Sequence, residues 1–172
     1  SLGLEKLVSS RQFHSDTINF VNGSDVLVSW SKANGALSGA VNVADKMSPL
    51  FIAPPGDALA TDRSGIGLVI KIADCQSILL VDPGKRVIAN VHSGWRGSVQ
   101  NIGGKTVEQL RERYGCDPSG MFAAVSPSLG PCCAEFVNYR DELPSELWKF
   151  RVRPDYFDFW AITRNQLTEA GI

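Results

Sequence analysis

The centre of the chain contains two apolar segments that are joined by a strong turn signal. QSILLVD (residues 76–82) and RVIANVH (86–92) are connected through the tripeptide Asp-Pro-Gly at 82–84. Proline fixes φ and glycine tolerates positive φ, so this tripeptide is typical of a tight hairpin turn. The pattern predicts two antiparallel neighbouring strands, around which the rest of the fold must be arranged. Their nearly continuous apolar character predicts burial on both faces of the sheet.

Other runs of strand length lie on both sides of this hairpin. They are DVLVSW (25–30), DALATD (57–62), GIGLVIKIAD (65–74) and MFAAVSP (121–127). Residues 31–49 are rich in Gly, Ala, Ser and Asn and have weak periodicity. We therefore predict a loop or mobile excursion over 31–49, with the strand-like GAVNVA (39–44) as an alternative within it.

The hydrophobic period changes to that of a helix in two later segments. In residues 98–114 the apolar positions follow helical spacing, and Gly115 provides a C-terminal stop. Residues 158–170 predict a second helix of the same kind. Together, these elements predict a single α/β (α+β) domain over residues 1–172, with a mixed, largely antiparallel central sheet flanked by helices.

Composition narrows the class of function. The 172 residues are 44% hydrophobic and carry a formal net charge of −1, which gives no electrostatic reason to expect nucleic acid or an anionic membrane as a partner. The sequence begins without a signal-peptide pattern and contains no apolar run long enough for a membrane span. A disulfide between the adjacent Cys132 and Cys133 would be strained, and CxxC is absent, so we expect a reducing, cytoplasmic setting.

Cys75 and His92 are the first candidates for a functional site. Hairpin counting from the turn at 82–85 places residues 75–76 opposite 91–92. A cysteine paired with a histidine can act as a thiolate nucleophile with its base, or the two can bind zinc with further ligands. Taken singly, each residue is more often structural than functional, and the local pattern leaves the thiol and metal mechanisms open.

The turn that follows His92 adds a candidate binding element. Gly94, Trp95, Arg96 and Gly97 open the helical segment. Free backbone N–H groups at a helix N-terminus favour an anion, and a guanidinium suits phosphate or carboxylate. An indole ring can stack on a flat ligand.

Six blocks of the sequence resemble one protein family. They are RQFHSD (11–16), GDALATD (56–62), ADCQSILLVDP (73–83), VHSGWRGS (91–98), SPSLGPCCAEF (126–136) and FDFWAITRNQLTEAGI (157–172). The combination of ADC-x-x-ILL-x-D with H-x-GWRG resembles the laccase-domain family, also called polyphenol oxidase-type proteins, whose members are understood as purine nucleoside phosphorylases. The resemblance extends from about residue 4 to the end of the chain.

The resemblance implies a zinc site and a set of catalytic residues. The implied zinc ligands are His14, Cys75 and His92, with an open position for catalysis. The implied activities are phosphorolysis of adenosine, inosine, guanosine or methylthioadenosine, and deamination of adenosine. We expect catalytic roles for Cys75, His92 and Asp74, with Asp62 as a second candidate for proton transfer. Gly94, Trp95, Arg96 and Gly97 are expected to bind phosphate or substrate.

The resemblance also leaves alternatives. The family fold is likened to that of cysteine hydrolases, which keeps a Cys–His thiol hydrolase or amidase as a second hypothesis. Copper can bind a His₂Cys set, but four cysteines and two methionines do not supply a multicopper site. The remaining hypothesis is an inactive, metal-stabilised binding domain. The resemblance further implies a monomer whose partners are a purine nucleoside and phosphate.

The chain departs from the family pattern at several positions. Ser126 stands where family members usually have glycine, and Gln76-Ser77 replaces a commoner apolar-proline pair. Ala134 stands where a tyrosine is usual, so we expect one aromatic border of the pocket to be missing. Compared with the family, the sequence is expected to lack a C-terminal segment beyond Ile172.

Overall fold

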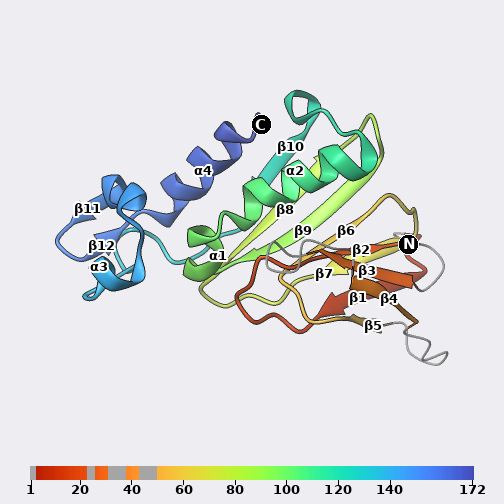
Figure 1. Ribbon diagram of the computed structural model, residues 1–172, viewed down its shortest axis with the longest axis horizontal. Helices are drawn as coiled ribbons and strands as arrows, with labels where there is room; N and C mark the ends of the chain where they lie inside the picture. Colours follow the sequence, from red (N-terminus) through yellow and green to blue (C-terminus); the bar gives the residue numbers. More distant parts are fainter. Residues whose placement is uncertain (1–2, 23–25, 31–37, 43–49) are drawn as a thin grey trace.

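The computed structural model describes residues 3–22, 26–30, 38–42 and 50–172 (Figure 1). The strands are β1 (Lys6–Ser10), β2 (Ile18–Val21), β3 (Val26–Trp30), β4 (Ser38–Asn42), β5 (Leu50–Ala53), β6 (Ala58–Thr61), β7 (Ile66–Val69), β8 (Gln76–Asp82), β9 (Val87–Ser93), β10 (Phe122–Val125), β11 (Arg151–Arg153) and β12 (Tyr156–Phe157). The helices are α1 (Trp95–Val99), α2 (Ile102–Tyr114), α3 (Tyr139–Glu142), α4 (Phe159–Glu169) and two 3₁₀ helices, η1 (Pro118–Gly120) and η2 (Ser145–Phe150). None of the helices in these ranges has the length and apolar character needed to cross a membrane.

A seven-stranded sheet forms the centre of the molecule, in the order β10-β8-β9-β6-β2-β3-β4. Every neighbouring pair in it is antiparallel except β2 and β6. The predicted mixed, largely antiparallel sheet is therefore confirmed. The predicted hairpin is also confirmed, since β8 and β9 pair without interruption from Gln76–Ser93 to Asp82–Val87.

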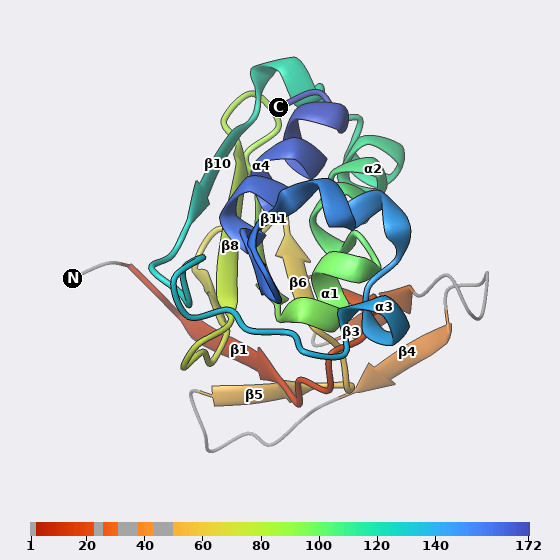
Figure 2. The same ribbon diagram turned by 90° about the vertical axis from the view of Figure 1, so that its left-hand side faces the viewer.

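The two faces of this sheet are covered by different layers (Figures 1 and 2). Helices α2 and α4 pack on one face, where Ile78 and Leu80 of β8 contact the buried side chains of α2. A smaller, all-parallel sheet, β5-β1-β7, covers part of the opposite face, where Leu59 of β6 packs with Val8 of β1 and Ile66 of β7. This second sheet was not expected, because parallel pairing joins segments that are distant in sequence.

The predicted burial of β8 on both faces is wrong. Leu80 is 0% exposed, whereas its neighbours Leu79 and Val81 are 47% and 39% exposed. Helices cover only one face of β8, and β10 occupies its edge rather than its other face. β8 is therefore apolar along its whole length although only one of its faces is buried. The sequence alone does not show which face is exposed.

The predicted strand over 65–74 is too long. Only Ile66–Val69 forms β7, and the chain then leaves the sheet toward Cys75. The side chain of Gln12 accepts a hydrogen bond from Lys71 N and donates one to Lys71 O, at 2.9 and 2.8 Å. These bonds satisfy the backbone of Lys71 without a strand partner and attach this segment to the loop after β1.

The predicted helix over 98–114 is divided into α1 and α2. Asn101 lies between them in the left-handed region (φ 55°), and its side chain accepts a hydrogen bond from Gly104 N at the start of α2. A Cβ at Gly104 would lie 2.6 Å from the Asn101 side chain, so this cap requires glycine. Gly115 ends α2 with φ 65°, as predicted. The predicted late helix is confirmed as α4, whose N-cap is Asp158.

The prediction for residues 31–49 is wrong in part. Ser38–Asn42 form β4, which pairs antiparallel with β3 at the edge of the large sheet. The rest of the predicted loop, residues 31–37 and 43–49, lies outside the described residues.

One-sided burial of β8 predicts that two neighbouring substitutions destabilise the protein to different extents. Leu80→Ala should lower the free energy of unfolding by about 2–5 kcal/mol, because it opens a cavity under α2. Leu79→Ala should lower it by roughly 1 kcal/mol or less, because its side chain is half exposed. Denaturant unfolding of the two variants measures the difference. Equal losses of stability would contradict the one-sided packing.

Candidate metal centre

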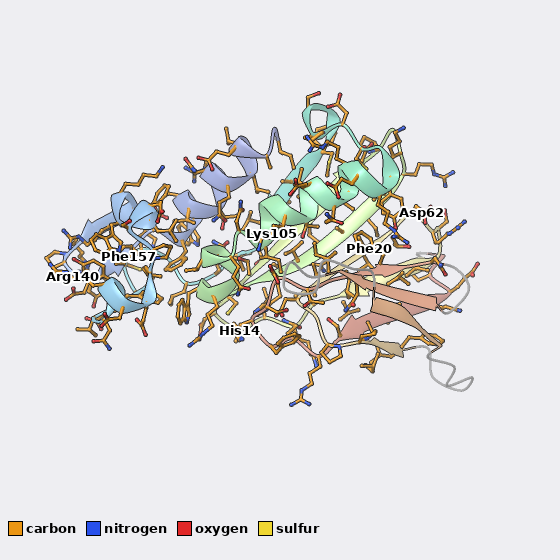
Figure 3. All side chains as sticks on the ribbon, viewed as in Figure 1. His14, Phe20, Asp62, Lys105, Arg140 and Phe157 are labelled. Atoms are coloured by element: carbon orange, nitrogen blue, oxygen red, sulfur yellow. The ribbon has the colours of Figure 1, made fainter. Side chains whose placement is uncertain are left out.

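Three side chains of metal-ligand type come together at one end of the large sheet. His14 lies in the loop after β1, Cys75 directly precedes β8, and His92 is near the end of β9. Their ligand atoms all lie within 4.8 Å of one another, and Cys75 Sγ is 3.9 Å from His14 Nε2. The rings of His14 and His92 meet edge to face with centroids 4.9 Å apart. Figure 3 labels His14 beside α1.

The strand register explains how Cys75 reaches this cluster. Gln76 pairs with Ser93 and Ser77 pairs with His92, so Cys75 lies one residue beyond the ladder, diagonal to His92. Hairpin counting therefore predicts the proximity but not the exact pairing. A Cβ at Gly94 would lie 2.7 Å from His14 Cδ2 and 3.0 Å from Cys75 Sγ. Only glycine at position 94 allows the histidine and the cysteine to approach each other.

A buried aspartate that the sequence reading missed holds the two histidines in place. Asp57 Oδ1 lies 2.8 Å from His92 Nδ1 and accepts a hydrogen bond from His14 N at 3.0 Å. Asp57 Oδ2 accepts hydrogen bonds from Ser15 N, Ser15 Oγ and Phe13 N, at 2.8, 2.7 and 3.3 Å. The signal in the sequence is the aspartate in GDALATD, at the start of an otherwise apolar strand.

The hydrogen bonds to Asp57 fix its ionisation and the tautomer of His92. Burial tends to raise the pKa of Asp57, but the hydrogen bonds from His92, Ser15 and His14 outweigh it and hold the pKa at about 2. A carboxylate only accepts hydrogen bonds, so Nδ1 of His92 carries the proton and Nε2 is left free as a ligand. The bond to His14 N also stabilises the left-handed backbone of that residue (φ 63°).

The residues fit a divalent transition metal. Two imidazoles and one thiol form a donor set typical of zinc. Tetrahedral Zn–N and Zn–S bonds place such ligand atoms about 3.3–3.6 Å apart, slightly closer than the 3.9 Å between Cys75 Sγ and His14 Nε2. His92 and Asp57 are buried, whereas His14 is exposed, so the cluster faces solvent on the His14 side. Burial, Asp74 and Asp57 raise the pKa of Cys75, and a bound cation would reverse this effect by stabilising the thiolate.

An apolar slot of about 180 Å³ adjoins the cluster. Its walls include the aromatic side chains of Trp95, Phe136 and Phe159, together with Leu129 and the Cys75 side chain. Phe136 meets Trp95 edge to face at 5.8 Å and lies 5.2 Å from Phe159. The slot is smaller than the roughly 300–1,000 Å³ of pockets that enclose a drug-sized ligand, so it suits one flat ring system.

The structure places the other candidate residues at different distances from the cluster. Asp74 and Trp95 line the slot, and exposed Arg96 stacks over the Trp95 ring at 4.0 Å. Gly97 faces Ile102 and Ser93 rather than the slot. Asp62 lies at the far end of β6, where it pairs with Arg63, and Figure 3 labels it well away from His14. The helix that these residues open, α1, has only five residues.

Gln76, Ser77 and Ser126, the expected departures from the family pattern, form hydrogen bonds at the start of β8. Ser77 N donates to Ser126 Oγ at 2.9 Å, a bond that a proline at 77 and a glycine at 126 lack. Buried Gln76 donates to Phe159 O at 3.2 Å and accepts from Thr163 Oγ1. These contacts attach the start of β8, and with it Cys75, to α4. Ala134 is buried and lines the slot, in the place where the sequence predicts a missing aromatic border.

Comparisons with known proteins place this architecture among relatives. A family model described as "Multi-copper polyphenol oxidoreductase laccase" matches residues 1–172. The chain is 34% identical to the purine nucleoside phosphorylase YlmD of Geobacillus stearothermophilus, covering 98% of this chain and 59% of that protein. It is 31% identical over 121 residues to the purine nucleoside phosphorylase LACC1 of Mus musculus, covering 67% of this chain and 28% of the mouse protein.

Solved structures agree with the sequence matches. The crystal structure of YlmD from Geobacillus stearothermophilus superposes with a TM-score of 0.71 at 31% identity, covering 97% of this chain and 59% of that chain. The chain therefore spans about 59% of the length of this relative. The resemblance found in the sequence is confirmed at the level of family and fold.

The buried carboxylate of Asp57 predicts that the free energy of unfolding falls at acid pH. Because the pKa of Asp57 is about 2 in the fold against an ordinary 3.8, its contribution is complete above about pH 4 and is lost as pH falls toward 2. The free energy of unfolding should fall by roughly 2 kcal/mol over that interval. Asp57→Asn should be less stable at pH 7 and should lose most of this acid dependence, as measured by denaturant unfolding at several pH values.

Asp62→Asn is the matched control, because Asp62 belongs to an exposed ion pair. Its free energy of unfolding should fall at acid pH as much as that of the unchanged protein, since exposed pairs contribute little to stability. An equal fall in the free energy of unfolding at acid pH in Asp57→Asn would contradict the role assigned to Asp57.

Proposed function

The chain belongs to the family described as multi-copper polyphenol oxidoreductase laccase, and on that premise we propose that it acts as a zinc-dependent purine nucleoside phosphorylase. The observation that carries the proposal is the His14–Cys75–His92 group beside an aromatic slot. The group offers metal ligands, and the slot offers stacking surfaces for a purine. Relatives named purine nucleoside phosphorylase support this substrate class.

Zinc fits the donor set better than the copper chemistry in the family's description. Multicopper oxidation needs several copper sites, and the described part of the chain brings together one group of three His, Cys or acidic ligands. His92 would bind through Nε2, Cys75 through Sγ and His14 through its ring, with Asp57 fixing His92 from behind. When bound, zinc supplies a Lewis acid next to the slot.

The residues around the slot have separate tasks in phosphorolysis. The purine ring stacks among Trp95, Phe136 and Phe159, which leaves the ribose at the solvent side. Arg96 binds phosphate through its planar donor fork and is held near the slot by stacking on Trp95. In the reaction a phosphate oxygen forms a bond to the anomeric ribose carbon as the bond to the purine nitrogen breaks. Asp74, at the slot wall, transfers to the departing purine the proton that its nitrogen requires.

Adenosine deamination is a second activity of the same site. The amine-bearing carbon of adenine would need to face Cys75 and the two histidines, whereas phosphorolysis needs the ribose near Arg96. The two reactions therefore use different ends of one bound nucleoside, and product analysis separates them.

A thiol hydrolase is the alternative function that a specific observation favours. Cys75, His92 and Asp57 form a cysteine, a histidine and a buried carboxylate that orients the histidine, as in hydrolytic triads. Against it, burial, together with the charges of Asp74 and Asp57, raises the pKa of Cys75, which lowers the thiolate fraction in the metal-free protein. Rapid alkylation of Cys75 by iodoacetamide in a protein without metal would favour the hydrolase.

Metal content tests the ligand assignment. Protein purified without added metal should contain about one zinc per chain by elemental analysis, as expected for one His₂Cys site. Cys75→Ser and His92→Ala should each lose most of the zinc, whereas Cys132→Ser should retain it, because that thiol is exposed and outside the cluster. Copper in place of zinc, or equal zinc in all variants, would contradict the assignment.

The products formed from adenosine test the reaction. With phosphate present, we expect adenine and ribose 1-phosphate, resolved by chromatography. Inosine formed equally with and without phosphate would identify deamination as the main activity. No product from metal-loaded, folded protein would contradict both activities and favour a binding domain.

The role of Arg96 predicts a change in one kinetic constant. Arg96→Ala should raise the KM for phosphate by roughly tenfold or more, the loss expected for a charge-assisted hydrogen bond. The KM for the nucleoside should change little. Arg164→Ala, on the exposed side of α4, is the control and should leave both constants unchanged. An unchanged KM for phosphate in Arg96→Ala would remove Arg96 from the phosphate site.

A further inference from the structure

Two adjacent cysteines that the proposed function does not use lie in an exposed turn after β10. Cys132 and Cys133 are both exposed, and their Sγ atoms are 3.0 Å apart. They stand outside the metal-type cluster and do not line the slot. The residue that follows them, Ala134, is buried and does line the slot. The dithiol is therefore accessible to solvent and one residue away from a wall of the site.

The geometry of neighbouring residues makes a bond between these thiols possible but strained. Consecutive Cα atoms are 3.8 Å apart, below the usual range of about 4.4–6.8 Å for disulfides. The sulfur atoms would have to approach from 3.0 Å to about 2.05 Å. The peptide between the residues must turn to allow this approach. Strained, exposed disulfides are the ones that are readily reduced again.

The backbone of the turn is held by contacts that such a rotation would disturb. Cys133 N and Ala134 N both donate to Gly130 O, and Arg153 donates to Cys132 O at 2.8 Å. Ala134 O in turn accepts a hydrogen bond from Phe157 N at 3.1 Å. A change in the peptide at 132–133 therefore shifts both Arg153 and Ala134.

Trp160 provides an optical reporter at the other end of the turn. A Cβ at Gly130 would lie 3.0 Å from the Trp160 ring, so the ring packs directly on this glycine. Trp160 Nε1 also donates to Ser128 Oγ at 2.8 Å. Movement of the turn changes the surroundings of an indole that is close to it.

We propose that Cys132 and Cys133 are a reversible oxidation site, which a small-molecule disulfide converts to an intramolecular disulfide that displaces the 130–134 turn beside the slot. One thiolate attacks a sulfur of the reagent, forms a mixed disulfide and releases one thiol. The second thiolate then attacks the protein sulfur of that mixed disulfide and releases the other thiol. The protein loses two electrons and two protons, which the reagent gains as it becomes two thiols.

The other two cysteines are poorer targets. Cys116 is buried, and burial, with its hydrogen bond to Asp82, raises the pKa of Cys116 to about 12, so almost no thiolate is present. Cys75 belongs to the metal-type cluster, where a bound ion would occupy its sulfur. At the pair, hydrogen bonding to Cys132 and the charge of Cys132 raise the pKa of Cys133.

The test is oxidation of the metal-loaded protein with oxidised glutathione, followed by trapping with N-ethylmaleimide and peptide mass mapping. We expect the peptide with Cys132 and Cys133 to lose two hydrogen atoms, with Cys75 and Cys116 still reduced. Tryptophan fluorescence should shift in parallel, and reduced glutathione should reverse both changes. The fluorescence shift should be absent in Trp160→Phe, which retains the dithiol.

Cys133→Ser and Cys132→Ser are the matched controls. Each should accumulate a glutathione adduct that the intact pair does not, because the second thiol is missing. Stable adducts on the intact pair, disulfides between chains, or oxidation of Cys75 first would overturn the proposal. So would a closed disulfide without a change in Trp160 fluorescence, since the turn would not have moved. These readouts do not depend on nucleoside turnover, so absence of phosphorylase activity in the same protein would leave this result unchanged.

Discussion

The carboxylate of Asp57 joins the segments from which the cluster is built. Both of its oxygens accept hydrogen bonds from the loop after β1, and one also bonds the ring of His92. A buried carboxylate is costly unless such donors surround it, so the loop with His14 and the ring of His92 are stabilised together. The loop carries an exposed histidine with a left-handed backbone. Without Asp57, nothing else described in the structure bonds the backbone N–H of His14.

The seven-stranded sheet positions Cys75 relative to the two histidines. The β8–β9 hairpin brings Cys75 diagonal to His92, and Gly94 removes the side chain that would separate the cysteine from His14. The start of β8 is fixed from the other side by Gln76, which bonds α4, and by Ser77, which bonds Ser126. Gln76 and Ser77 thus hold the start of β8, and with it Cys75, at the cluster.

Local chemistry in the sequence predicts much of this fold, whereas contacts between distant segments are harder to predict. Asp-Pro-Gly predicts the hairpin, where Asp82 Oδ1 accepts a hydrogen bond from Lys85 N, and Gly115 ends α2 with φ 65°, because both effects act within a few residues of the chain. The parallel β5-β1-β7 sheet depends on pairing between remote segments, and the exposed side of Leu79 depends on which face the helices cover. The family resemblance identifies His14, Cys75 and His92. Asp57 was missed because a polar residue at a strand start also reads as part of a turn.

The proposed zinc site consists of His14, Cys75 and His92, oriented by Asp57. X-ray absorption at the zinc edge measures this directly on the purified protein. We expect one sulfur neighbour at about 2.3 Å and nitrogen or oxygen neighbours at about 2.0–2.1 Å, with imidazole scattering from two histidines. In Asp57→Asn the imidazole signal should weaken while the sulfur remains. A shell without sulfur, or an identical imidazole signal in Asp57→Asn, would contradict this site.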